Sequence, residues 1–183
     1  MYAPVFQKID DLLRAKQLVV VALDGPCASG KTTLATKLSQ QYACTILRMD
    51  DFFLKPHQRT PERLAEPGGN IDYERFRAEV VEGILKHTQG TYKSYNCQTD
   101  ETTTHHISEL GNLCIVEGSY SHHPYFNNPY DLRIFIDIDS TTQLERLKVR
   151  NPKMFDTFVN KWIPLEEAYF LTHDIRAHSD LVI

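Results

Sequence analysis

The sequence predicts an α/β protein in which helices cover both faces of an open parallel sheet. Apolar runs of strand length alternate with helical segments along the chain, and most of these runs end in polar or acidic residues. A Gly-x-x-x-x-Gly-Lys-Thr segment follows the first apolar run and precedes a helical pattern. Such alternation favours a parallel sheet with its ligand at the carboxyl ends of the strands. The length of 183 residues fits one domain, residues 1–183.

The first part of the chain predicts a helix followed by a strand-helix-strand unit. Apolar residues recur at helical spacing over 5–13, and the run 17–23 suits a central strand that is buried on both faces. Leu34 and Leu38 mark one face of the next helix, and 44–49 predicts the second strand. The phosphate-loop signature therefore lies inside a β-α-β unit.

The later elements are predicted from the same patterns. Proline, glycine and charge over 55–69 indicate an irregular surface loop. Three more strands, two arms of a hairpin and three helices follow. The strands are 113–116, 132–138 and 180–183. A short strand or hairpin arm is expected at 91–98, with 107–110 as a candidate returning arm. The helices are 73–87, one from Ser140 as N-cap to Arg150, and 155–172, kinked or split at Pro164.

The segment from Gly25 to Thr32 has the residues of a phosphate-binding loop. Its glycines let the backbone curl until its amides face phosphate oxygens, and the following helix directs its N-terminal amides at the same place. Lys31 places a positive charge near the β and γ phosphates, and the Thr32 hydroxyl is a ligand for Mg²⁺. The expected nucleotide-binding residues are Gly25, Ala28, Ser29, Gly30, Lys31, Thr32 and Thr33.

Acidic residues at the ends of two other strands are expected near this loop. Glu117 follows an apolar strand, where an acid holds Mg²⁺ directly or through water, although a solvated loop acid would look the same. Asp50 and Asp51 follow the second strand, and adjacent side chains on an extended backbone point to opposite faces. We expect Asp50 to be the general base or a metal ligand and Asp51 to cap a turn, with the reverse assignment left open.

Composition excludes several other classes of protein. The net charge of −4 and the absence of a Lys/Arg cluster disfavour nucleic-acid binding. Four scattered cysteines suggest neither a zinc site nor a disulfide framework. No apolar run approaches the length of a membrane span or a signal peptide, so we expect a cytoplasmic location. The oligomeric state stays open, and a homo-oligomer is allowed.

Several motifs together resemble the uridine kinase family, which belongs with phosphoribulokinase and pantothenate kinase among the P-loop kinases. The segment Asp50-Asp51-Phe52-Phe53 looks like that family's Asp-x-Phe-Tyr, and Asn70-Ile71-Asp72 looks like its Asn-Phe-Asp. Glu117-Gly118 resembles its Glu-Gly, and Arg150 falls where its lid carries an arginine. The resemblance runs from about residue 18 to the C-terminus. It implies a P-loop NTPase fold of three α/β/α layers with a five-stranded parallel sheet and a lid.

The resemblance also implies roles for individual residues. Asp50 would activate a sugar hydroxyl, Asp72 would accept hydrogen bonds from ribose hydroxyls, and Tyr95 would line the acceptor pocket. A helix-capping role for Asp72 and a structural role for Tyr95 are the alternatives. Arg150, and less strongly Arg146, would reach the γ-phosphate. This chain departs from the family in a short lid, 151–154, and in Cys97 and Asp100 beyond the pocket tyrosine.

The sequence therefore predicts an ATP- and Mg²⁺-dependent kinase that phosphorylates a hydroxyl of a nucleoside or a similar ribose-containing metabolite. One alternative is a nucleoside monophosphate kinase of the cytidylate type, for which Arg48, Arg59, Arg63 and Arg75 are candidate phosphate clamps. Another is an ATP-binding module without acceptor chemistry. The expected partner is a small-molecule acceptor.

Overall fold

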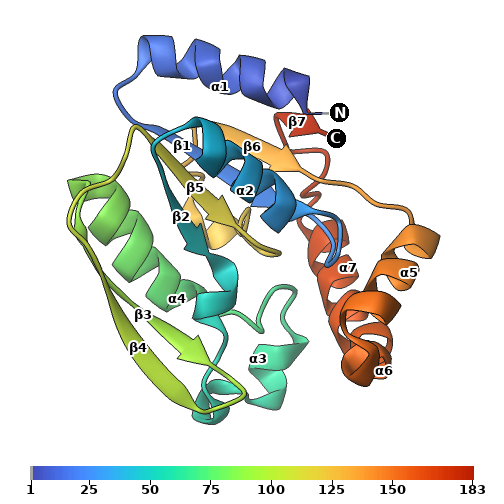
Figure 1. Ribbon diagram of the computed structural model, residues 1–183. Helices are drawn as coiled ribbons and strands as arrows, with labels where there is room; N and C mark the ends of the chain where they lie inside the picture. Colours follow the sequence, from blue (N-terminus) through green and yellow to red (C-terminus); the bar gives the residue numbers. More distant parts are fainter. Residues whose placement is uncertain (1) are drawn as a thin grey trace.

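The computed structural model describes residues 2–183 and has a five-stranded parallel sheet at its centre (Figure 1). The strands lie in the order β2-β5-β1-β6-β7, and neighbouring strands pair in parallel. Their bounds are β1 Val19–Asp24, β2 Cys44–Arg48, β5 Leu113–Glu117, β6 Leu132–Phe135 and β7 Leu181–Val182. The predicted sheet of five parallel strands is confirmed.

Helices pack on both faces of this sheet. The α-helices are α1 Ala3–Ala15, α2 Lys31–Gln41, α3 Pro61–Ala65, α4 Tyr73–Phe76, α5 Ser140–Arg150, α6 Phe155–Thr157 and α7 Ile163–Thr172. Two π-helical stretches continue α4 and α6: η3 Arg77–Leu85 and η6 Phe158–Trp162. Short 3₁₀ turns lie at η1 Met49–Phe52, η2 Pro56–Gln58, η4 Pro124–Phe126 and η5 Pro152–Met154.

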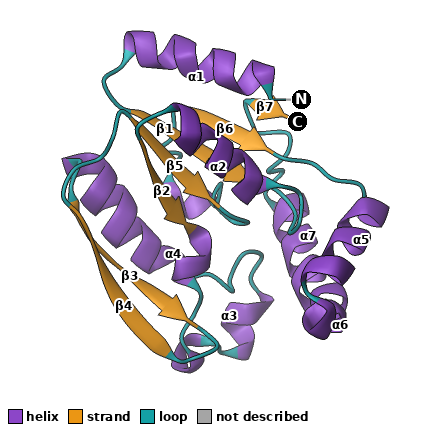
Figure 2. Cartoon of the chain, in the orientation of Figure 1, coloured by secondary structure: helices purple, strands orange, loops and turns teal. Residues whose placement is uncertain are grey.

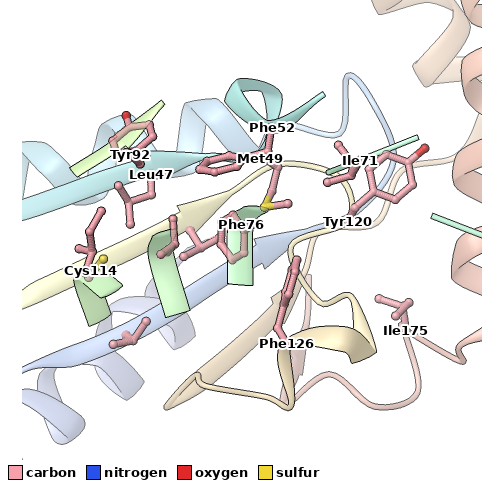
Figure 3. Packing of buried hydrophobic residues seen from close by; sticks show 14 of the residues in the cluster. Leu47, Met49, Phe52, Ile71, Phe76, Tyr92, Cys114, Tyr120, Phe126 and Ile175 are labelled. Carbon is pink, nitrogen blue, oxygen red and sulfur yellow. The ribbon is translucent and has the colours of Figure 1, made fainter. Parts of the chain in front are cut away.

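The strands are apolar throughout because each face supplies a different core. In β5, Leu113 and Ile115 pack with α1 and α2, whereas Cys114 and Val116 face the opposite side. That second core holds residues of α4, η3 and α7, including Phe76, which packs edge-on against Phe52 and beside Phe126 (Figure 3). Alternating side chains of one strand therefore enter two separate cores, which makes three layers.

The β3–β4 hairpin forms a separate sheet beside the central one (Figure 2). Its strands are β3 Gly90–Asn96 and β4 Glu101–Ile107. The hairpin is as predicted, but the expected returning arm at 107–110 is wrong. Polar residues from Glu101 onward form that arm because the hairpin has little sheet or helix to cover its outer face, so the strand needs no apolar run.

Three further details correct the sequence-based expectations. The acidic pair after β2 lies in the 3₁₀ turn η1 and not on an extended strand end. Asp139, not Ser140, caps α5, since its carboxylate accepts a hydrogen bond from the Thr142 amide at 2.9 Å. The segment 55–69 carries η2 and α3 within its irregular course.

The expected kink at Pro164 takes the form of the wide turn η6 just before it. The Ile163 amide bonds to the Phe158 carbonyl, five residues back. Proline has no amide hydrogen and its ring crowds the preceding turn, so a wider turn relieves the clash without ending the helix. Among residues 2–183, no helix combines the length and the apolar character needed to cross a membrane.

Candidate active site

A cavity of about 1520 Å³ opens at the carboxyl ends of the central strands. Its wall includes the loop between β1 and α2, with Cys27 to Thr33, and the strand-end acids Asp50 and Glu117. Figure 1 shows α5 and α6 on one side of these strand ends and the β3–β4 hairpin with α3 on the other. Typical small-ligand sites occupy about 300–1,000 Å³, so this cavity has room for two small molecules.

The loop after β1 has the backbone conformation that its glycines permit. Gly25 has a φ of 138° and Gly30 a φ of 111°, and Ala28 also lies at positive φ. A Cβ atom at Gly25 would come within 2.2 Å of the Ile136 carbonyl oxygen, so no side chain fits there. Of the seven predicted nucleotide-binding residues, all except Gly25 line the cavity, and Gly25 shapes the turn behind them.

Lys31 begins α2 and folds back over the loop. Its ammonium group donates hydrogen bonds to the Gly25 carbonyl at 2.6 Å, to the Pro26 carbonyl at 2.8 Å and to the Ser119 hydroxyl at 3.2 Å. These contacts use all three of its donors. The amine is thus held within the cavity wall, at the centre of the loop that would bind phosphates.

Thr32 and Glu117 are joined directly. The Thr32 hydroxyl donates to the Glu117 carboxylate at 2.8 Å, and Glu117 is only 6% exposed. Burial raises the pKa of Glu117, while the Thr32 hydrogen bond and Lys31 act in the opposite direction. Asp50 lies on the same cavity. Hydroxyl and carboxylate oxygens are what Mg²⁺ prefers, so Thr32, Glu117 and Asp50 fit a magnesium ion that also binds phosphates and water.

Asp50 and Asp51 point in different directions, although both lie in the turn η1. Asp50 faces the cavity, and crowding by protein atoms raises the pKa of its carboxyl against the attraction of Lys31, Arg150 and Arg48. Asp51 does not line the cavity and accepts a hydrogen bond from the Tyr92 hydroxyl on β3 at 3.3 Å. Asp50 thus lies on the cavity as expected, whereas Asp51 contacts β3 and, within residues 2–183, caps no turn, contrary to expectation.

The two arginines of α5 line the cavity but have different contacts. Arg146 donates to the carbonyls of Ala28 at 3.0 Å and Ser29 at 3.3 Å, so it holds the loop itself. Arg150 donates to the Asn151 side chain at 2.7 Å. Arg150 is therefore the better placed of the two to reach a phosphate.

The two residues predicted to contact the acceptor do not line the cavity. The Asp72 carboxylate caps α4, accepting from the Arg75 amide at 3.1 Å, from the Arg75 guanidinium at 3.1 Å and from Gln58 at 3.0 Å. The Tyr95 hydroxyl donates to Asp100 at 2.9 Å. Both side chains are buried, Tyr95 being held within its own hairpin and Asp72 by its own helix and by Gln58 of η2, which is the structural alternative for each.

This part of the wall is formed by two residues to which sequence reasoning assigns no individual role, although Asn70 belongs to the segment that resembles Asn-Phe-Asp and Tyr120 begins the segment after Glu117 that is expected on the acceptor side. Asn70 and Tyr120 line the cavity and are 6% and 3% exposed. Within residues 2–183 their side-chain polar atoms have no hydrogen-bond partner, although the two groups are neighbours. Tyr120 also has a φ of 76°, which is uncommon for a bulky residue and is often found at functional sites. Phe53 and Trp162 add an aromatic surface, with ring centres 6.1 Å apart.

Comparisons with known proteins agree with this architecture. The sequence matches no family model and no curated protein. Among solved structures, one described as a possible uridine kinase from Bacillus stearothermophilus has 21% identity and a TM-score of 0.72, covering 98% of this chain and 99% of that one.

Two further structures are similar over most of their length. The YGR205w protein has 15% identity and a TM-score of 0.58, with 97% of this chain and 88% of that chain covered. TT1252 from Thermus thermophilus has 14% identity and a TM-score of 0.50, with 91% and 88% covered. The comparisons thus support the fold: the chain has the three-layer α/β/α architecture of the structure described as a possible uridine kinase.

Proposed function

We propose that this protein is an ATP-dependent small-molecule kinase, similar to uridine kinase, that phosphorylates a hydroxyl of a nucleoside or another ribose-containing metabolite. The observation that carries the proposal is the meeting of the phosphate loop, Asp50 and Glu117 on one cavity large enough for two ligands. Phosphoryl transfer depends mainly on positioning and on neutralising charge, and these residues supply both.

Each residue has a defined role in the proposed reaction. The amides of the loop and the Lys31 ammonium bind the phosphates, while Thr32 and Glu117 hold the magnesium ion, which when bound offsets the charge of the phosphate oxygens. Asp50 accepts the proton of the acceptor hydroxyl as that oxygen attacks the γ-phosphorus. Arg150 approaches the transferring group from the lid.

The acceptor end of the cavity favours an uncharged molecule. Among residues 2–183, the basic side chains on the cavity wall are Lys31, Arg146 and Arg150, all on the nucleotide side. Asn70 and Tyr120 offer neutral donors and acceptors that suit hydroxyl groups. We propose that these two contact the acceptor, and that Asp72 and Tyr95 support this wall and contribute to acceptor binding through it.

Three of the four candidate phosphate clamps of a nucleoside monophosphate kinase are engaged elsewhere, and the fourth, Arg48, does not line the cavity. Arg59 donates to the Leu54 carbonyl at 2.8 and 3.0 Å. Arg63 binds the carboxylate of Glu74 and two backbone carbonyls, and Arg75 binds Asp72 and two backbone carbonyls. An acceptor that carries its own phosphate would need several free cations at this end.

The four cysteines are free thiols, which supports the proposed cytoplasmic location.

The test is a phosphoryl-transfer assay with Mg-ATP and a panel of nucleosides, nucleoside monophosphates and other ribose-containing metabolites. We expect a neutral nucleoside-like acceptor to be phosphorylated by the wild type, and Asp50→Asn to lower kcat by at least about 100-fold. Asp51→Asn is the matched control and should retain activity within about threefold, since Asp51 faces away from the cavity. The proposal fails if no acceptor is phosphorylated, or if only monophosphates are.

A further inference from the structure

Glu166 is a buried carboxylate on the cavity that the proposed reaction does not use. It lies on α7 and is 6% exposed. One of its oxygens accepts a hydrogen bond from the Cys27 backbone amide at 2.8 Å, and the other accepts from the Ser119 hydroxyl at 2.7 Å. A carboxylate from the far end of the chain is thus bound to the phosphate loop and to the segment after β5.

The contacts of Glu166 continue to Lys31. The Ser119 hydroxyl lies 2.7 Å from the Glu166 carboxylate and 3.0 Å from the Gly25 carbonyl, and its one proton favours the nearer, charged acceptor; its oxygen accepts a hydrogen bond from the Lys31 ammonium at 3.2 Å. The result is a chain of carboxylate, hydroxyl and ammonium in a buried site, where such charge-assisted contacts are strong and directional. The position of the ammonium group therefore depends in part on the carboxylate.

Both backbone polar groups of Cys27, the amide and the carbonyl, are hydrogen-bonded to side chains of two helices. Glu166 accepts from its amide, and the Gln143 side chain of α5 donates to its carbonyl at 3.0 Å. Gln143 lies on α5, which ends where the lid 151–154 begins, and Glu166 lies on α7, which continues the helical run of α6 and η6 that follows the lid. The contacts thus connect the conformation of the phosphate loop to both ends of the lid.

We infer that Glu166 is a positioning residue: it fixes the Cys27 amide and, through Ser119, the Lys31 ammonium in the geometry needed for phosphoryl transfer. The inference rests on the proposed function. Both oxygens of Glu166 accept hydrogen bonds, as in a carboxylate, and such a group would repel a nucleotide, so its benefit lies in orientation and not in affinity. Removing its charge should therefore lower kcat without weakening nucleotide binding.

The variants are chosen to separate the two contacts. In Glu166→Gln the amide oxygen can still accept one hydrogen bond, but the amide nitrogen cannot accept the second. Ser119→Ala removes the link to Lys31 and leaves the Cys27 contact, whereas Ser119→Thr keeps a hydroxyl and should restore activity. Glu167→Gln is the matched control, because Glu167 is the exposed neighbour on the same helix.

Two measurements test the inference. With Mg-ATP and an acceptor, we expect Glu166→Gln and Ser119→Ala each to lower kcat at least about tenfold with KM for ATP unchanged or lower. Hydrogen exchange without any ligand should show the Cys27 amide exchanging at least about tenfold faster in Glu166→Gln than in Glu167→Gln. Wild-type kcat in Glu166→Gln, or a lower Tm with kcat/KM unchanged, would overturn the inference.

The hydrogen-exchange measurement distinguishes a failure of this inference from a failure of the proposed function. If the wild type transfers no phosphate but Glu166→Gln still accelerates exchange at Cys27, the proposed reaction fails and the positioning of the loop stands. If exchange at Cys27 is the same in Glu166→Gln and Glu167→Gln, the positioning role is wrong whatever the wild type catalyses.

Discussion

Protonation of His123 should destabilise the fold in mild acid. The imidazole is 8% exposed and stacks against Tyr73, with ring centres 4.7 Å apart, and against Tyr169 at 5.9 Å. Its Nδ1 accepts a hydrogen bond from the Tyr125 amide at 3.2 Å, and its Nε2 has no partner among residues 2–183. Burial, assisted by the nearby His173 and Arg63, lowers the pKa of His123 from 6.5 to about 4. The folded state therefore keeps this side chain neutral.

The size of the effect follows from that difference in pKa. The unfolded chain binds the proton near pH 6.5 and the folded protein only near pH 4, so the stabilisation is complete above pH 6.5 and is lost as pH falls toward 4. The full loss is about 3 kcal/mol, of which about 2 kcal/mol should be gone by pH 5. Burial also lowers the pKa of His122, which contributes in the same direction.

Urea denaturation of the wild type and of His123→Phe at several pH values gives the contribution of His123 to the pH dependence of the free energy of unfolding. Phenylalanine keeps the ring stack but cannot titrate, so other groups cancel in the difference between the two proteins. The free energy of unfolding of the wild type relative to the variant should fall by about 2 kcal/mol between pH 8 and pH 5. His87→Gln, at an exposed position, should run parallel to the wild type. Parallel curves for His123→Phe would refute the reasoning.

Three other predictions concern the phosphate loop, the general base and the hydrophobic core. Gly25→Ala places a Cβ against the Ile136 carbonyl at positive φ, so it should lower the free energy of unfolding by more than about 2 kcal/mol and abolish binding of a non-hydrolysable ATP analogue. The control Gly83→Ala, in a helical stretch, should change the free energy of unfolding by less than about 1 kcal/mol. Equal effects of the two substitutions in urea denaturation and in nucleotide binding would contradict this expectation. The raised pKa of Asp50 predicts that kcat/KM rises with pH through a midpoint above 3.8, as the base ionises, and a midpoint at or below 3.8 would contradict it. Phe76→Ala should lower the free energy of unfolding, measured by urea denaturation, by about 3–5 kcal/mol, because the ring is wholly buried between Phe52 and Phe126. A loss below about 1 kcal/mol would show that the neighbouring side chains fill the space left by the ring.

The sheet and the phosphate loop were predictable because their signals are local. An apolar run of five or six residues buried on both faces has few alternatives, and the loop needs its glycines where they stand. Because the carboxyl ends of parallel strands lie at one edge of a sheet, Asp50 and Glu117 could be placed at the same edge from their positions after two apolar runs.

The acceptor wall was harder to predict because its residues depend on tertiary contacts. Asp72 has the residue type for binding hydroxyls, but the same carboxylate is a good helix cap, and in the fold its oxygens accept from Arg75 and Gln58. The Asn70-Ile71-Asp72 motif does not show which of its polar side chains faces the cavity, and the residue type of Tyr120 does not distinguish a cavity wall from a loop. Glu166 looks like any acid on a helix until the packing of α7 brings it to Cys27.

The wide turn η6 has a consequence for which side chains share one face of the helix. Along an α-helix, residues four apart drift by about 40° at each step, so Phe158, Trp162 and Glu166 would spread over about 80°. A π-helical turn holds more residues and offsets that drift, which lets all three line the cavity. Deleting one residue between Phe158 and Trp162 would put Phe158 seven residues before Glu166, a spacing that a regular α-helix places within about 20° of the same face, so the wide turn would no longer be needed to align the two. The wide turn before Pro164 thus keeps Phe158, just after the lid, on the same helix face as Glu166, which contacts the phosphate loop.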